Sequence, residues 1–284
     1  MSQAIARLDP RHREKPRNFL ISYSGRVGSS ALVDTLKAIP GFLVPVFEDL
    51  DYWHIEQRGG LDEHSEATIH HAVDYTYRTI PDGFDPARTS VGFKWRIWGE
   101  IDRVSGVLRD HGVVVLNMVR CDIVEYIASL YLTDIVNHDF NAPQFMLRDA
   151  ASEAERMDIL FKYRMQTCTA DLDAYFSLYE SQVRIERERL DLLARLRRDG
   201  HRVCTIFYED FAYKRYRFLN ALLKLLNHPP LAQPPVTALT KVATAYPSEL
   251  FDNRAELLAD ARTARALREW DELVCWPREG LLAV

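Results

Sequence analysis

Residues 21–32, ISYSGRVGSSAL, begin like a buried β-strand, turn through two glycines and continue as a helix. The apolar, β-prone residues 18–23 include the start of this stretch, and residues 31–39 have helical spacing. Pro40 and Gly41 then end the helix. The stretch therefore predicts a strand, a glycine loop and a helix in direct succession.

The rest of the chain repeats this alternation of strand and helix. Further strands are predicted at 42–47, where Pro45 indicates an edge strand or a loop, and at 90–95, 113–119 and 203–208. Helices are predicted at 101–110, through most of 150–199, at 214–226 and from about 248. Alternating strands and helices imply an α/β fold with a mostly parallel central sheet, three layers and a helical insert at about 133–199.

Composition limits the class of protein. The chain has 284 residues, of which 47% are hydrophobic and 27% charged, as expected for one sizeable domain at 17–284. The net charge of −5 argues against a nucleic-acid partner but allows a small cationic pocket. The four cysteines include no CxxC pair, and no apolar run reaches the length of a membrane span, so neither a metal site nor an integral membrane segment is predicted. Residues 1–16 resemble a flexible lead-in without a signal-peptide core, which indicates a cytoplasmic protein.

The first turn has the chemistry of an anion site. A glycine turn between a strand and a helix exposes backbone N–H groups at the positive end of the helix dipole, where phosphate or sulfate binds. Arg26 adds a permanent charge, and Ser29 and Ser30 add hydroxyls. An ordinary turn with serine caps is the alternative. The ATP-binding motif GxxxxGK[ST] is absent, because Gly25 and Gly28 are too close together and no lysine precedes Ser29.

Two segments resemble sulfotransferases that use 3′-phosphoadenosine 5′-phosphosulfate (PAPS). Residues 26–30, Arg26-Val27-Gly28-Ser29-Ser30, are similar to the family loop that cradles the 5′-phosphosulfate. Arg120 and Ser129 resemble the pair that binds the 3′-phosphate, although the family spacing is eight residues and Cys121 occupies that position. Either the strand end bulges or Arg120 approaches the phosphate from another angle. The alternative is that Arg120 is only a strand-end charge.

Three further segments match the same family in the same order. Residues 91–94, ending in Lys94, resemble its GFK strand, whose lysine can face the cleft. Residues 207–211, FYEDF, resemble its YEDL segment, in which we interpret the acids as structural, because carboxylates would repel an anion. Lys241 resembles a cation of the loop that closes over the nucleotide. The resemblance implies a fold of the P-loop type.

The family also implies a catalytic base. Glu48 lies shortly after the first helix, where related bacterial and carbohydrate sulfotransferases carry a catalytic glutamate. Asp49 and His54 are the neighbouring candidates, and an exposed acidic loop is the alternative. The Glu/Arg-rich residues 178–199 are interpreted as the solvated face of a helix, with a dimer contact or a lid as alternatives.

The resemblance implies an enzyme that transfers a sulfuryl group from PAPS to an acceptor hydroxyl and releases 3′-phosphoadenosine 5′-phosphate (PAP), without a metal. Glu48, Arg26 and Lys94 are the implied catalytic residues. A carbohydrate, a lipid-linked sugar or a small metabolite could be the acceptor, and a homodimer is possible. Two alternatives stay open: a kinase of the same fold, and a module that binds an anion or a sugar without turnover.

Overall fold

The computed structural model describes residues 15–45, 73–96, 101–134, 150–164, 167–233, 235, 246–275 and 281. Five parallel strands form one sheet in the order β2-β3-β1-β4-β5. Their bounds are β1 Phe19–Tyr23, β2 Phe42–Leu43, β3 Ser90–Trp95, β4 Val114–Val119 and β5 Val203–Phe207. The predicted parallel sheet is confirmed, with β2 at its edge and β1 in the middle.

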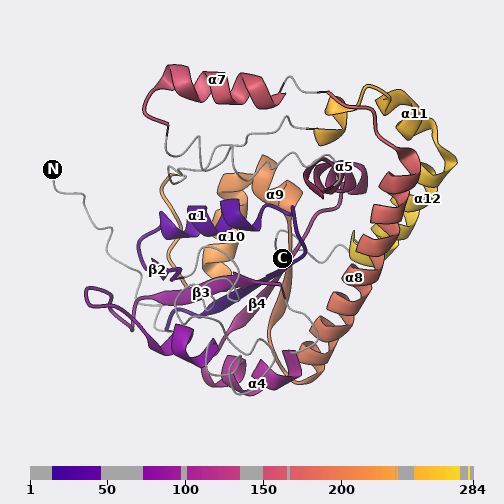
Figure 1. The fold of residues 1–284 in the computed structure, drawn as a ribbon. Helices are drawn as coiled ribbons and strands as arrows, with labels where there is room; N and C mark the ends of the chain where they lie inside the picture. The colour runs from indigo at the N-terminus through magenta and orange to yellow at the C-terminus, as the bar shows by residue number, and fades with distance from the viewer. Residues whose placement is uncertain are drawn as a thin grey trace, which may run out of the picture.

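Alternate residues of the strands point to opposite faces, so the sheet has a core on each side. Phe19, Ile21 and Leu116 face one core, together with buried residues of α1 (Ser29–Lys37), α5 (Ile123–Asp134) and α10 (Arg215–Leu225). The opposite strand residues pack against α4 (Ile101–Asp110) and the end of α8 (Leu172–Arg198). Helices on both faces of a parallel sheet give the three layers that the sequence predicts (Figure 1).

The predicted helical insert consists of two helices among the described residues. These are α7 (Glu153–Arg164) and the long α8. Between them, residues 167–171 are not helical, and Cys168 forms a parallel bridge with Phe251. The helix predicted through most of 150–199 is thus divided into two helices, and Asp171 begins α8 by accepting hydrogen bonds from the amides of Asp173 and Ala174.

Further helices follow β5. They are α9 (Tyr208–Tyr213), the 3₁₀ turn η1 (Pro247–Leu250), α11 (Arg254–Ala259), α12 (Ala261–Trp270) and the π-helical turn η2 (Asp271–Cys275). α11 and α12 lie beside the start of α8 (Figure 1).

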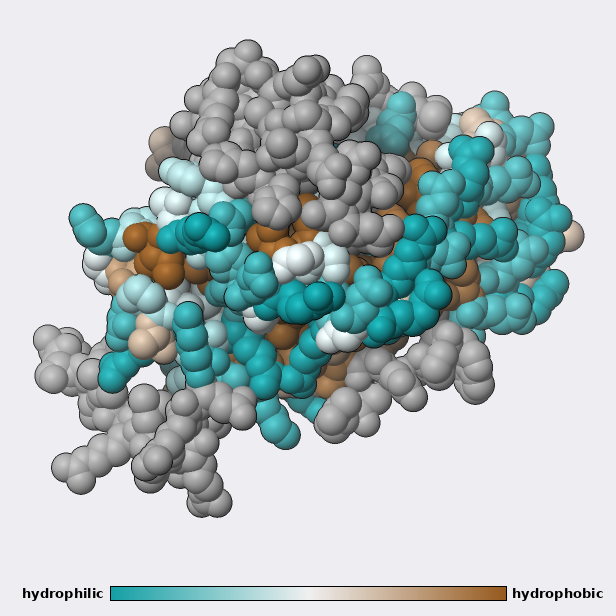
Figure 2. Space-filling model, turned by 90° about the horizontal axis from the view of Figure 1, so that it is seen from below, coloured by the Kyte–Doolittle hydropathy of each residue, from teal (hydrophilic) through white to brown (hydrophobic). Residues whose placement is uncertain are grey.

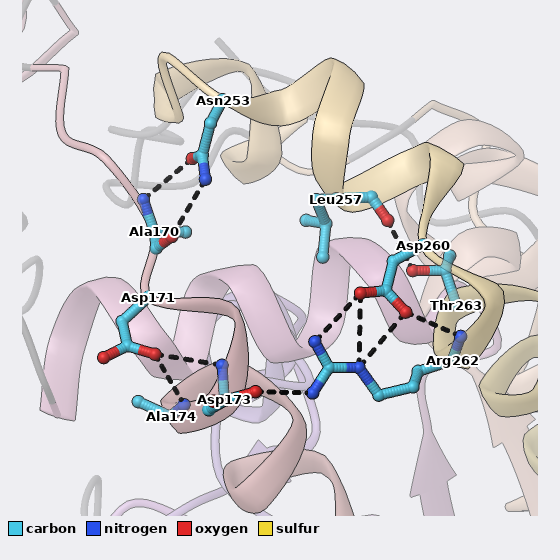
Figure 3. A network of polar contacts seen from close by, with 9 residues as sticks. All are labelled: Ala170, Asp171, Asp173, Ala174, Asn253, Leu257, Asp260, Arg262 and Thr263. Carbon is cyan, nitrogen blue, oxygen red and sulfur yellow. Dashed lines mark hydrogen bonds and ion pairs between the residues drawn. The ribbon is translucent and has the colours of Figure 1, made fainter.

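Polar contacts dock this C-terminal segment onto the insert (Figure 3). The Asn253 side chain exchanges two hydrogen bonds with the backbone of Ala170, at 2.8 and 2.9 Å. Arg262 bridges Asp260 of its own turn and Asp173 of α8, at 2.9 and 2.7 Å. Residues about 90 positions apart in the chain are thereby held together.

From the side of α4, the described surface is mainly hydrophilic, with hydrophobic residues visible between the polar ones (Figure 2). In this part of the chain, no helix has both the length and the apolar character needed to cross a membrane.

Candidate anion-binding site

The loop between β1 and α1 is the centre of the site. Arg26 and Gly28 both have left-handed backbone conformations, with φ of 61° and 81°. Gly28 is the N-cap of α1 and has no side chain to offer the amides of the first turn. These amides lie at the positive end of the helix dipole, an arrangement that suits an anion.

A neighbouring side chain also leaves no room for a Cβ atom at Gly28. A Cβ atom at this position would lie 2.7 Å from Cδ2 of Tyr208, the first residue of α9. The glycine therefore lets the loop approach the aromatic ring, and Tyr208 forms one wall of the site. Only the two acids of the 207–211 segment were interpreted from the sequence, so Tyr208 was missed. Its position as an aromatic residue at a strand end was the available signal.

Lys94 reaches the same loop from β3. Its side chain is only 2% exposed, its Nζ donates a hydrogen bond of 2.7 Å to Ser30 Oγ, and it lies 5.4 Å from the centre of the Tyr23 ring. A buried ammonium is strongly desolvated, which strengthens its attraction for any anion that enters. The structure thus places predicted residues Lys94 and Ser30 together.

Arg26 and Ser129 are also in contact. The Arg26 Nε donates a 3.3 Å hydrogen bond to Ser129 Oγ on α5. The resemblance implies that these residues bind two different anionic groups, and the structure brings the two residues into contact.

Arg120 is buried where β4 ends. Its side chain is 6% exposed, its guanidinium lies 4.8 Å from the Tyr208 ring centre, and its Nε has no hydrogen-bond partner among the described residues. Arg120 is therefore buried at the strand end. β4 pairs with β5 in regular register up to Val119, so the paired part of the strand contains no bulge. Arg120 directly follows a regular strand.

A buried ion pair of α8 contacts the residue that precedes the β1–α1 loop. Glu186 and Arg189 of α8 are 1% and 3% exposed and bond to each other. The Ser24 hydroxyl, just before the loop, donates to Glu186 at 3.1 Å and accepts from the Tyr126 hydroxyl at 3.0 Å. Burial is the main cause that raises the pKa of Tyr126, so its hydroxyl keeps its proton.

Arg189 completes this support on β1 and β4. It donates to the backbone oxygen and hydroxyl of Ser22, at 3.4 and 3.3 Å, and to the side chain of Asn117. The prediction of a solvated face for residues 178–199 is therefore wrong for Glu186 and Arg189. Their i,i+3 spacing gave no sign of burial, because the same spacing is common on exposed helices.

Several candidates lie outside the described residues, namely Glu48, Asp49, His54 and Lys241. The two acids after Tyr208 are structural as predicted: Glu209 accepts from the backbone of Cys121 and Asp122, and Asp210 pairs with Lys214. In the described ranges, no cluster of three His, Cys, Asp or Glu side chains could hold a metal ion.

Comparison with solved structures gives a structural likeness. A solved sulfotransferase from Alicyclobacillus acidocaldarius is similar over 91% of this chain and 95% of its own, with 16% sequence identity and a TM-score of 0.48. No protein-family model matches the chain, and no curated protein matches it in sequence.

Proposed function

We propose that the protein is a sulfotransferase that uses PAPS and an acceptor hydroxyl. The observation that carries this proposal is that three cationic side chains are linked to the uncapped N-terminus of α1. Arg26 lies in the β1–α1 loop, and Lys94 at the end of β3 bonds to Ser30. Arg120 after β4 lies over the ring of Tyr208, which is next to Gly28. Such a site suits an anion with several phosphate or sulfate oxygens.

The site residues divide between two anionic groups of one ligand. Arg26, Lys94 and the amides of the first turn would bind the 5′-phosphosulfate, which supplies the sulfuryl group. Arg120 and Ser129, with Lys241 as a further candidate, would bind the ribose 3′-phosphate. The fit is supported at Arg120, because its buried Nε has no acceptor among the described residues and a phosphate oxygen would supply one.

The chain's residues would act by electrostatics and by proton removal. The cations would stabilise charge on the group in transfer and on the phosphate that leaves. Glu48 would take the acceptor proton, with Asp49 and His54 as the other candidates. The acceptor would be a carbohydrate, a lipid-linked sugar or a small metabolite.

Titration with PAP tests the nucleotide site. We expect PAP to bind the wild-type protein, and Lys94→Met to weaken binding by about tenfold or more, since a charge-assisted hydrogen bond contributes roughly 1.5–3 kcal/mol. Lys224→Met is the matched control, because Lys224 is exposed on α10 and should leave binding unchanged. Stabilisation by MgATP but not by PAP would instead indicate a kinase.

Transfer of labelled sulfuryl groups from PAPS to a panel of acceptors tests catalysis. We expect Glu48→Gln to reduce turnover while PAP affinity stays the same, because the base is not needed for nucleotide binding. Asp49→Asn and His54→Gln are the matched variants. Tight PAP binding with no product from any acceptor would favour a binding module.

A further inference from the structure

Arg120 is held by side chains from two distant elements. It lies in the three-residue connection between β4 and α5. The indole Nε1 of Trp270 donates a 2.9 Å hydrogen bond to the Arg120 backbone oxygen, across 150 positions of sequence. Glu209 Oε1 accepts from the amides of Cys121 and Asp122, at 3.0 and 3.1 Å. Three hydrogen bonds thereby fix the peptide planes on which the direction of the Arg120 side chain depends.

Trp270 makes a specific contact as well as a packing contact. It is 1% exposed at the last position of α12 and packs against Tyr126, with ring centroids 5.7 Å apart. An indole has a single donor, and here that donor binds the Arg120 carbonyl. Apolar packing alone would have been served by phenylalanine.

Two buried polar atoms beside this connection have no hydrogen-bond partner among the described residues: Arg120 Nε and Glu209 Oε2. A buried arginine normally pairs with a nearby carboxylate, since an unsatisfied buried donor costs about 1–3 kcal/mol. Here the carboxylate binds backbone amides through its other oxygen, and the Arg120 Nε keeps its donor capacity. The arrangement thus leaves the buried guanidinium able to satisfy an external acceptor.

We propose that Trp270 and Glu209 are positioning residues that hold Arg120 for the phosphate of a nucleotide, so that helix α12 is coupled to the anion site. This inference rests on the proposed function, because it requires an anionic ligand at Arg120. Neither residue touches the ligand in this scheme. Both act through the backbone of the connection that carries Arg120.

A double-mutant cycle on PAP affinity tests the coupling. We expect Trp270→Phe, which removes the indole donor, to weaken PAP binding by about fivefold to tenfold, as the loss of one net hydrogen bond implies. In an Arg120→Met background, the same substitution should have no further effect on affinity. A merely structural role of Trp270 would weaken binding equally in both backgrounds.

Thr263→Val is the matched control. The Thr263 hydroxyl donates a buried 2.6 Å hydrogen bond to the Leu257 backbone within the same C-terminal segment, without contact to Arg120. Its removal should lower thermal stability without changing PAP affinity. If Trp270→Phe does not fold, two variants at Glu209 test the same role. Glu209→Gln keeps an acceptor oxygen and should bind PAP nearly as wild type does, whereas Glu209→Leu should bind PAP more weakly.

The outcomes separate the two proposals. If wild-type protein does not bind PAP, the proposed function fails and the positioning role fails with it. If wild type binds PAP and Trp270→Phe and Glu209→Leu bind it equally well, the proposed function stands and the positioning role is overturned. If Trp270→Phe weakens PAP binding equally in the wild-type and Arg120→Met backgrounds, the positioning role is also overturned.

Discussion

Gly28 combines two constraints that only glycine satisfies. Its φ of 81° lies in the left-handed region, and a Cβ atom would lie 2.7 Å from the Tyr208 ring. The first constraint costs another residue roughly 1–2 kcal/mol, and the second forces the ring or the loop to move. The loop conformation and the wall of the anion site are therefore fixed at the same residue.

We expect Gly28→Ala to destabilise the protein more than Gly200→Ala does, and to weaken PAP binding as well. Gly200 has a similar φ of 86° but nothing within 4 Å of its Cβ position, so its substitution measures the backbone effect alone, about 1 kcal/mol. Urea unfolding and PAP titration of both variants give the comparison. Equal losses of stability and unchanged PAP affinity would show that contact with Tyr208 does not matter.

At single residues, the sequence could indicate chemistry but not burial. Arg26 was identified from the glycine turn, and Lys94 and Arg120 from the resemblance of their segments to sulfotransferase motifs. The contacts of Lys94 with Ser30 and of Arg120 with Tyr208 depend on the packing of different elements, which no local pattern records. The contact of Tyr208 with Gly28 depends on the same packing.

At the scale of elements, α8 links the insert to the loop. Its i,i+3 pair Glu186 and Arg189 lies under β1 and β4 and bonds to Ser22, Ser24 and Asn117. The sequence predicted a helix over much of this range but assigned the charges to solvent, because a charged pair is usually exposed. Only the tertiary packing of α8 against the sheet could show that this pair is buried.

Removal of one partner of this pair should be strongly destabilising. Arg189→Met leaves the Glu186 carboxylate buried without its counter-charge, for which we expect a loss of about 3–5 kcal/mol in the free energy of unfolding. The double variant Arg189→Met with Glu186→Leu should recover part of the loss. Glu188→Gln, an exposed residue of the same helix, should stay within about 0.5 kcal/mol of wild type. A small effect of Arg189→Met in urea unfolding would contradict a structural role for the pair.

A buried acid joins α5 to the C-terminal segment. Glu125 accepts a 2.9 Å hydrogen bond from the Ser248 amide and also binds the Ser248 hydroxyl, and burial raises the pKa of its carboxyl above the ordinary value of 4.5. A raised pKa in the folded state means that its contribution to stability is complete below pH 4.5 and is lost as pH rises through the folded-state pKa.

We therefore expect the stability difference between wild type and Glu125→Gln to change with pH. The free energy of unfolding of wild type, relative to that of the variant, should be highest near pH 4 and should fall toward pH 7, because the glutamine does not ionise. Urea unfolding across this range measures the difference. Glu256→Gln, at an exposed position of α11, is the control. A difference that grows with pH would show that hydrogen bonds from Ser248 outweigh the effect of burial.

For the whole molecule, the sequence predicted the class of fold and, at residues 42–47, an edge strand or a loop, but the order of the strands lay beyond it. The strand order depends on tertiary packing, which includes contacts at the β2 edge of the sheet. There, the ring of His228 stacks on Phe42 with centroids 4.3 Å apart and bonds through Nε2 to the Ser90 hydroxyl, at 2.7 Å. This histidine connects the chain after α10 to two neighbouring strands.

His228 should make the molecule sensitive to acid. Burial lowers the pKa of its imidazole from 6.5 to about 4, so the histidine contributes stability above pH 6.5 that is lost as pH falls through 4. At about 1.4 kcal/mol per pKa unit, the full loss is about 3 kcal/mol. We expect the free energy of unfolding to fall between pH 6.5 and 4, and His228→Gln to flatten this decline. His201→Gln tests the second buried histidine, whose pKa is also lowered by burial. An unchanged slope in the His228 variant would assign the acid sensitivity to other groups.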